Sequence, residues 1–289
     1  MKTPRFGHIL LATDGSRQAE AAVDVTIAFA KASAASVDVV HVWNLEVHHR
    51  HGVWDVETRH EAEDLIESTV TRIRSAGVPT RGEIMHADVA HVSSAIALAA
   101  RECDADLVVV GSRALSDWQS IFTHSVSHEL LCRLDRPMLI VHSRQPAFVG
   151  GSRRILVAIA GGDDVLPALR AAIAVASGAD SQALVVHVAQ AFVGAQGYAY
   201  VEPEQEIQVT LQTATSLLSE AGIASEALVP HAGPVAELIA RIAAEWRADV
   251  VIIGTGRLGD VGSIVFGSVT HDLLRATERP LLVAERSRA

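Results

Sequence analysis

One pattern that occurs twice limits the fold of this chain more than any other feature. Residues 107–143 contain an apolar run, a glycine, a segment with helical spacing that ends just before a proline, and a second apolar run. Residues 250–285 repeat this order. The paired positions, each separated by 143 residues, are Gly111 with Gly254 and Pro137 with Pro280. One half of the chain is therefore a diverged copy of the other.

Length and composition agree with two domains. A chain of 289 residues fits two domains of about 150 residues each. Hydrophobic residues make up 49% and charged residues 20%, which is typical of a soluble α/β protein. We therefore predict a first domain at residues 1–145, a linker at 146–152, and a second domain at 153–289.

Net charge and cysteine content limit which binding partners and which cellular compartment the sequence favours. The net charge is −10 and no run of Lys or Arg is visible, which argues against nucleic acid as a partner. Residues 181–201 lack charge, but their Gln, His and Gly residues favour a strand followed by a loop over a membrane span. The two cysteines suggest no disulfide framework, so we expect a cytoplasmic protein that does not contact membranes.

Apolar runs alternate with segments of helical spacing throughout each half. This alternation predicts an α/β fold: two tandem Rossmann-like domains, each with a five-stranded, mostly parallel sheet and helices on both faces. In the first half we expect strands at 9–13, 37–42, 80–85, 107–110 and 138–141. In the second half we expect strands at 155–159, 183–188, 227–230, 250–253 and 281–284. The second strands lead into long loops, at 43–56 and at about 189–204.

In open α/β sheets a ligand binds beyond the carboxyl ends of the strands. A glycine there lets a phosphate approach the backbone, and a helix that starts with Ser or Thr adds N–H groups, a hydroxyl and a positive helix dipole. In the first half the candidate binding residues are Asp14, Val42, Gly111, Ser125 and Ser127. In the second half they are Val188, Gly254, Arg257, Gly267, Ser268 and Thr270.

Several of these residues also have a purely structural explanation. The two glycines could simply form turns after a strand, and the Ser and Thr residues are good helix caps without any ligand. Asp14 opens an Asp-Gly turn and could be present for that reason alone. Cys103 and Cys132 are most simply small buried residues.

At these positions the chain resembles the universal stress protein family, in a tandem arrangement that covers almost all of its length. ATP-binding members of that family carry Gly-x2-Gly-x9-Gly-Ser/Thr after the fourth strand and an Asp at the end of the first. The first half contains Gly111-x2-Ala114-x9-His124-Ser125 and Asp14. The second half contains Gly254-x2-Arg257-x9-Gly267-Ser268, with Ala160 in place of the Asp. Neither half keeps the whole pattern.

The resemblance implies a regulatory protein that binds ATP or a related adenine nucleotide, with Mg²⁺, in at least one half. It also implies that the halves pack together through their last strands as a pseudo-dimer, and it allows a homodimer with further protein partners. His124 places a side chain where the family has bare backbone, whereas the second half keeps Gly267 and Ser268. We therefore expect the phosphates in the second half, where Arg257 would act as a charged donor.

Two other functions stay open. A scaffold without a ligand would use its two long loops to contact partners, through Trp43, Trp54, Tyr198 and Tyr200. A slow ATPase is the second alternative, although the sequence offers no general base. Ser125 and His128 could be paired, but no Gly-x-Ser-x-Gly elbow and no orienting acid accompany them, so we predict no catalytic residues. We also predict no metal site, because His48, His49 and His51 in a polar loop are more often simply solvated.

Overall fold

The structure is a computed structural model, and it contains two compact units, Phe6–Phe148 and Val149–Ala289, the second of which also includes Met1–Arg5. The unit that begins at Phe6 is called the first half below, and the other the second half. The residues that the structure describes are 4–43, 57–88, 91–112, 126–142, 152–160, 165–176, 180–189, 191–194, 197–200, 203–231, 233–254 and 268–284.

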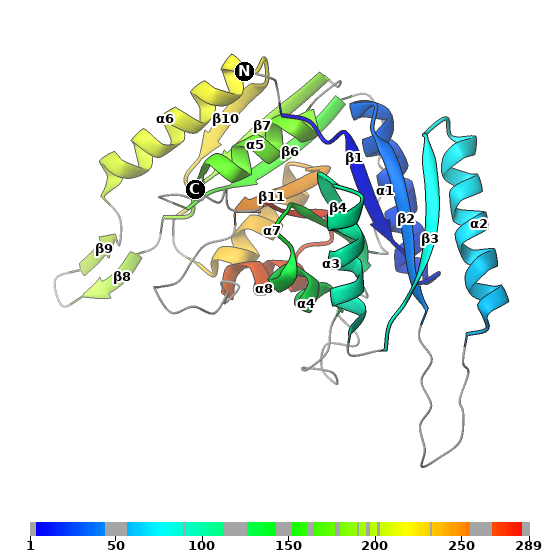
Figure 1. The fold of residues 1–289 in the computed structure, drawn as a ribbon. Coiled ribbons are helices and arrows are strands. Elements are labelled where there is room, and N and C mark those ends of the chain that lie inside the picture. The colour runs from blue at the N-terminus through cyan, green and yellow to red at the C-terminus, as the bar shows by residue number, and fades with distance from the viewer. Residues whose placement is uncertain are drawn as a thin grey trace, which may run out of the picture. The chain divides into compact units, whose positions relative to one another are not determined.

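The first half is a parallel sheet with four helices (Figure 1). Its strands are β1 (His8–Ala12), β2 (Ser36–Trp43), β3 (Thr80–His86), β4 (Leu107–Ser112) and β5 (Met138–His142). Its helices are α1 (Arg17–Ser33), α2 (Arg59–Ser75), α3 (Val92–Glu102) and α4 (Val126–Arg133). The strand order is β3-β2-β1-β4-β5, and every neighbouring pair is parallel.

The second half repeats this topology. Its strands are β6 (Ser152–Ala158), β7 (Asp180–Val186), β10 (Ala224–Leu228), β11 (Val250–Gly254) and β12 (Leu281–Ala284). Its helices are α5 (Val165–Ala176), α6 (Glu204–Glu220), α7 (Val235–Glu245) and α8 (Ser268–Ala276). The order β10-β7-β6-β11-β12 matches that of the first half, and the pairs are again parallel. The prediction of two α/β domains with five-stranded parallel sheets is confirmed.

A reversal of direction divides the helices between the two faces of each sheet. The chain moves outward from β1 to β3 and then returns to β4 on the other side of β1. Because parallel crossovers are right-handed, this reversal places α1 and α2 on one face and α3 and α4 on the other. The contacts agree, since α1 packs against α2, and α3 packs against α4. The buried strands between them form the core, with side chains such as Ile9, Leu107 and Leu139 fully enclosed.

Local sequence signals fix where the elements begin and end. The Ser16 hydroxyl caps α1, and Thr58 with Glu61 forms a reciprocal capping box at the start of α2. Gly77, which follows α2, has a φ of +83°, a conformation that favours glycine at a helix end. An aspartate before β4 accepts hydrogen bonds from the backbone N–H groups of Gly7 and His8, at 2.8 and 2.9 Å. This residue, Asp106, ties the start of β1 to the start of β4.

The second half differs from the sequence prediction after β7. The segment expected to be an unstructured loop contains two short antiparallel strands, β8 (Ala191–Gly194) and β9 (Gly197–Tyr200). Four-residue strands are too short for an alternating pattern to distinguish them from a loop. Several other strands begin or end one to three residues away from the predicted bounds. None of the described helices combines the length and the apolar character that a membrane span requires.

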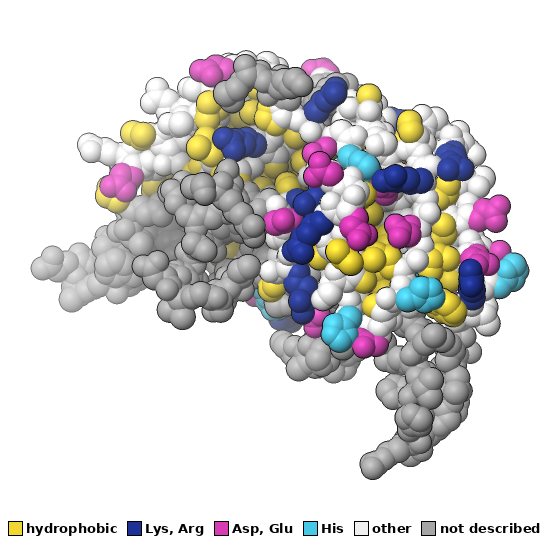
Figure 2. All heavy atoms as spheres, viewed as in Figure 1, with side chains coloured by type: hydrophobic (Ala, Val, Ile, Leu, Met, Phe, Trp, Pro, Cys, Tyr) yellow, Lys and Arg dark blue, Asp and Glu magenta, His cyan; other side chains and the backbone are white. Residues whose placement is uncertain are grey.

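Charged side chains of both signs lie on the face of the first half that Figure 2 shows. Figure 2 shows Lys and Arg side chains interspersed with Asp, Glu and His on the face in view.

Candidate functional site

The carboxyl ends of β1 and β4 are the topological switch point of the first half, and this place is called the crevice below. From these two neighbouring strands the connections run in opposite directions, which is the place where open α/β sheets bind ligands. Ala12 on β1 lies opposite Val110 on β4. Asp14 and Gly111, the residues just beyond this pair, therefore lie on the two sides of the crevice. The structure thus brings together two candidates that are far apart in the sequence.

Asp14 is exposed, and its side chain shapes the turn that follows β1. Its Oδ1 accepts a hydrogen bond from the Ser16 backbone N–H at 3.0 Å. Gly15 between them has a φ of +71°, a conformation that glycine adopts without strain. This arrangement is an Asx-turn, which is the structural explanation for Asp14. The side chain is also exposed to solvent.

Gly111 is needed for packing whether or not a ligand binds. A Cβ at this position would lie 2.6 Å from the carbonyl carbon of Gln18 and 2.7 Å from the nitrogen of Ala19. Both atoms belong to the backbone of α1 in its first turn. The first turn of α1 therefore rests directly on β4, and it does so beside the Asp14 turn. Packing against α1 therefore requires glycine at position 111, independently of the phosphate contact predicted from the sequence.

The end of β2 lies beside the end of β1 and carries several polar contacts. Val42 is 7% exposed and lies between two residues with specific polar contacts. His41 is buried, its Nδ1 lies 2.9 Å from the carbonyl oxygen of Thr13, and its Nε2 lies 2.8 Å from Glu57 Oε2. The indole N–H of Trp43 donates to the carbonyl oxygen of Glu57 at 2.8 Å. These contacts join the ends of β1 and β2 to the residues that precede α2.

The contacts of His41 and Glu57 were not predicted from the sequence. In the sequence His41 is a polar residue within a mostly apolar run, and Glu57 lies 16 residues further on. Pairing them requires the register of β1 and β2, which places Ala12 beside Val40. The role that the structure gives them is to position the strand ends.

The remaining candidates are only partly described. Ser127 lies in the first turn of α4 and is half-buried, and Thr270 lies in the first turn of α8 and is 5% exposed. Ser268 begins α8. Ser125, Arg257 and Gly267, together with the His48, His49 and His51 loop, lie outside the described residues.

The second half presents a different surface at the corresponding place. Ala158 on β6 lies opposite Ile253 on β11, so Ala160 and Gly254 take the positions of Asp14 and Gly111. Ala160 is exposed and Val188 is half-buried. Alanine has no hydrogen-bonding side chain. Among the described residues, the acidic group at this crevice is therefore present in the first half and replaced in the second.

Comparison with solved structures identifies the fold over the full length. A universal stress protein from Archaeoglobus fulgidus DSM 4304 is 20% identical, and the match covers 99% of this chain and 100% of that chain with a TM-score of 0.74. A protein described as a putative universal stress protein from Pseudomonas aeruginosa UCBPP-PA14 is 18% identical, over 99% of this chain and 95% of that chain, with a TM-score of 0.67.

A third structure is a universal stress protein in complex with cAMP. It is 23% identical and covers 48% of this chain and 98% of its own length, with a TM-score of 0.40. A likeness of this size does not carry its ligand over to the present chain. Among curated proteins, none matches this sequence.

The family itself is established by sequence. The pattern of the universal stress protein family matches the chain twice, at residues 5–142 and at residues 151–285. The two matches fall on the two sheets described above and together cover nearly the whole chain. With two copies of its domain in tandem, the chain belongs to the universal stress protein family.

Proposed function

We propose that this protein is a cytoplasmic stress-response regulator that binds ATP or a related adenine nucleotide at the carboxyl ends of its strands, in at least one half. The observation that carries the proposal is the switch point at the carboxyl ends of β1 and β4, which the second half repeats at β6 and β11. In the first half this place also holds Asp14. It is an exposed carboxylate directly beside the crevice between β1 and β4, where the topology favours a ligand. A carboxylate there can accept hydrogen bonds from the hydroxyl groups of a ribose.

Each half keeps a different part of the family's nucleotide-binding pattern. The first half has the acid but carries His124 in the phosphate loop, whereas the second half has Ala160 but keeps Gly267 and Ser268. The phosphates carry most of the charge of ATP, and the start of α8 offers backbone N–H groups and a helix dipole. We therefore favour the second half for the phosphates. Mg²⁺ would enter with the nucleotide.

The experiment has two steps on the full chain. Purified protein is denatured and the supernatant is analysed for released adenine nucleotide, and the nucleotide-free protein is then titrated calorimetrically with ATP and Mg²⁺. Gly267→Asp should abolish the heat of binding, because it adds a negative charge beside the phosphates. Gln212→Glu adds the same charge to an exposed position of α6 and should leave binding unchanged.

The outcome also assigns the site to a half. If Asp14→Ala abolishes binding and Gly267→Asp does not, the first half holds the nucleotide and our preference for the second is wrong. If no nucleotide is released and millimolar ATP gives neither heat nor a shift in melting temperature, nucleotide binding is refuted. The scaffold hypothesis, with contacts through residues 43–56 and 190–204, would then take its place.

A further inference from the structure

The amino ends of the strands in the first half carry a cluster with a chemistry of its own. His8 begins β1, Asp38 lies on β2, and Cys103 follows α3. Their ligand atoms, a histidine nitrogen, a carboxylate oxygen and a thiol sulfur, all lie within 4.8 Å of one another. Within the described ranges this is the group of such residues that could hold a metal ion. The nucleotide crevice lies at the opposite ends of the same strands.

We propose that these three residues form a binding site for a zinc-like divalent cation, separate from the nucleotide crevice. The donor set of imidazole, carboxylate and thiolate is one that zinc accepts, and a thiolate selects against Mg²⁺ and Ca²⁺. Zinc bonds of about 2.0 to 2.3 Å place two tetrahedral ligands roughly 3.5 Å apart. His8 Nε2 and Asp38 Oδ2 are already 3.0 Å apart. Side-chain shifts of about 1 Å would complete the set.

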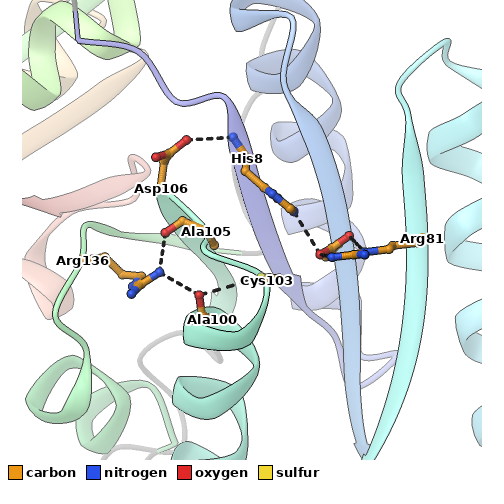
Figure 3. Close-up of polar contacts among 8 residues, drawn as sticks. His8, Arg81, Ala100, Cys103, Ala105, Asp106 and Arg136 are labelled. Atoms are coloured by element: carbon orange, nitrogen blue, oxygen red, sulfur yellow. Dashed lines mark hydrogen bonds and ion pairs between the residues drawn. The ribbon is translucent and has the colours of Figure 1, made fainter.

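Burial supports a built site. Asp38 is 8% exposed as a residue although its neighbours in the strand, Val37 and Val39, are apolar and buried. A buried carboxylate requires compensating charge or hydrogen bonds. Arg81 on β3 supplies them, with Nε 2.6 Å from Oδ1 and a terminal nitrogen 2.7 Å from Oδ2. Figure 3 shows Arg81 and His8 reaching the same carboxylate from the strands on either side of it, beside Cys103.

Arg81 holds the place that the metal would take. Its guanidinium is a cation on both oxygens of the carboxylate, so metal binding requires it to leave. Its side chain is 70% exposed, so it can turn into solvent without opening the core. Three protein ligands would leave one position of the ion open to water. The metal ion would therefore replace the Arg81 guanidinium as the cation that compensates the Asp38 carboxylate.

A redox role for the thiol is less well supported by its surroundings. Burial, followed by the charge of Asp38, raises the pKa of the Cys103 thiol, which lowers the fraction of reactive thiolate. Cys132 is also a free cysteine, and burial raises its pKa too. A bound metal ion removes the thiol proton directly, so metal binding does not depend on a reactive thiolate.

The second half shows how the same place is filled when no metal ligands are present. Asp249 accepts a hydrogen bond from the Arg154 N–H at 2.7 Å, as Asp106 does from His8, so Arg154 corresponds to His8. The residue that follows α7, as Cys103 follows α3, is Trp246. The Arg154 guanidinium lies over the Trp246 ring, 4.7 Å from its centre. On the neighbouring strand, Leu184 replaces Asp38.

The test uses the full chain, free of nucleotide, with Co²⁺ as a spectroscopic probe and Zn²⁺ measured against a chromophoric chelator. We expect one Co²⁺ per chain with a thiolate-to-cobalt charge-transfer band that Zn²⁺ abolishes. Cys103→Ser should remove the band, and Cys132→Ser, which changes the other free cysteine, should keep it. Arg81→Gln should bind Zn²⁺ several-fold more tightly, because the competing cation is gone.

The results that overturn the proposal are equally specific. They are no charge-transfer band in the wild-type protein, a band that survives Cys103→Ser, or weaker Zn²⁺ binding by Arg81→Gln. Cobalt bound without a thiolate band would assign the metal to other residues, such as the His48, His49 and His51 loop, and would also refute the site. Circular dichroism of each variant confirms that it is folded, and His8→Gln provides a second ligand variant that leaves the thiol in place.

Discussion

Replacing Gly111 with alanine tests whether this glycine serves packing or only ligand approach. The added Cβ would lie 2.6 Å from the backbone of α1, whereas carbon atoms in contact are normally about 3.5 to 4.0 Å apart. Backbone cannot rotate away as a side chain can, so α1 must shift by about 1 Å from its place on β4. Overpacking of this kind costs about 1–3 kcal/mol. The lower conformational entropy of the unfolded alanine variant offsets only about 0.4–1 kcal/mol of this destabilisation.

The chain contains a matched control for this substitution. A Cβ on Gly82, in β3, would lie 2.5 Å from Ile66 Cγ2 and 2.8 Å from Val70 Cγ2, which are methyl ends of side chains. Side chains can change rotamer, so Gly82→Ala should cost less than about 1 kcal/mol. Gly111→Ala should cost about 2 kcal/mol and lower the melting temperature of the first half by about 5–10 °C.

The measurement is thermal unfolding by calorimetry on both variants and the wild type, without nucleotide. If Gly111→Ala is as stable as the wild type, or no less stable than Gly82→Ala, the packing argument is wrong. The role of Gly111 would then be to let a ligand approach the backbone, and not to allow packing against α1. If the variant is destabilised, a loss of nucleotide binding in it says nothing about a direct phosphate contact.

Two further predictions concern the framework of the halves. Asp106→Ala removes the acceptor of two backbone hydrogen bonds, so it should lower the free energy of unfolding in urea by about 1–2 kcal/mol. Asp249→Ala removes one described hydrogen bond of this kind and should cost less. Equal losses in the two variants would contradict this prediction. Hydrogen bonds from the backbone and hydroxyl of Thr58 lower the pKa of Glu61 below its ordinary value of 4.5. Its contribution to stability is therefore complete above pH 4.5 and is lost as the pH falls through the lower folded-state pKa. The stability difference between the wild type and Glu61→Gln should shrink over that range, and a difference that does not change with pH would refute it.

The fold was predictable because its signals are local and repeated. Apolar runs such as residues 107–110 and the spacing of helical segments set the element order, and the right-handed crossover rule then limited the topology. The β8–β9 pair was missed because two four-residue strands carry too little periodicity. Contacts across the sheet were not predictable in the same way. His8 and Asp38 are 30 residues apart, and only the register of β1 with β2 brings them together.

The site shows the same limit at Gly111. From the sequence, a glycine after a strand indicated a phosphate loop or a simple turn, because both are reasons to omit a side chain there. The atoms that actually demand glycine belong to α1 at Gln18 and Ala19, more than 90 residues earlier in the chain. A pattern can show that a position must be small, but not which neighbour requires it. The prediction of the ligand-binding residues therefore stays a prediction, whereas the packing role of Gly111 rests on geometry.

Comparison of the two halves separates what the fold needs from what each half does. Asp106 and Asp249 both tie the first strand of a half to its fourth, so this contact is common to both copies. At both ends of the sheet the copies differ. Asp14 becomes Ala160 at the carboxyl ends, and the cluster around Asp38 is replaced by the stacked Arg154 and Trp246 at the amino ends. Both changes leave the strand order intact. A metal at one end and a nucleotide at the other would both act on β1 and β2, so the Zn²⁺ titration repeated with ATP present measures whether the two ends are coupled.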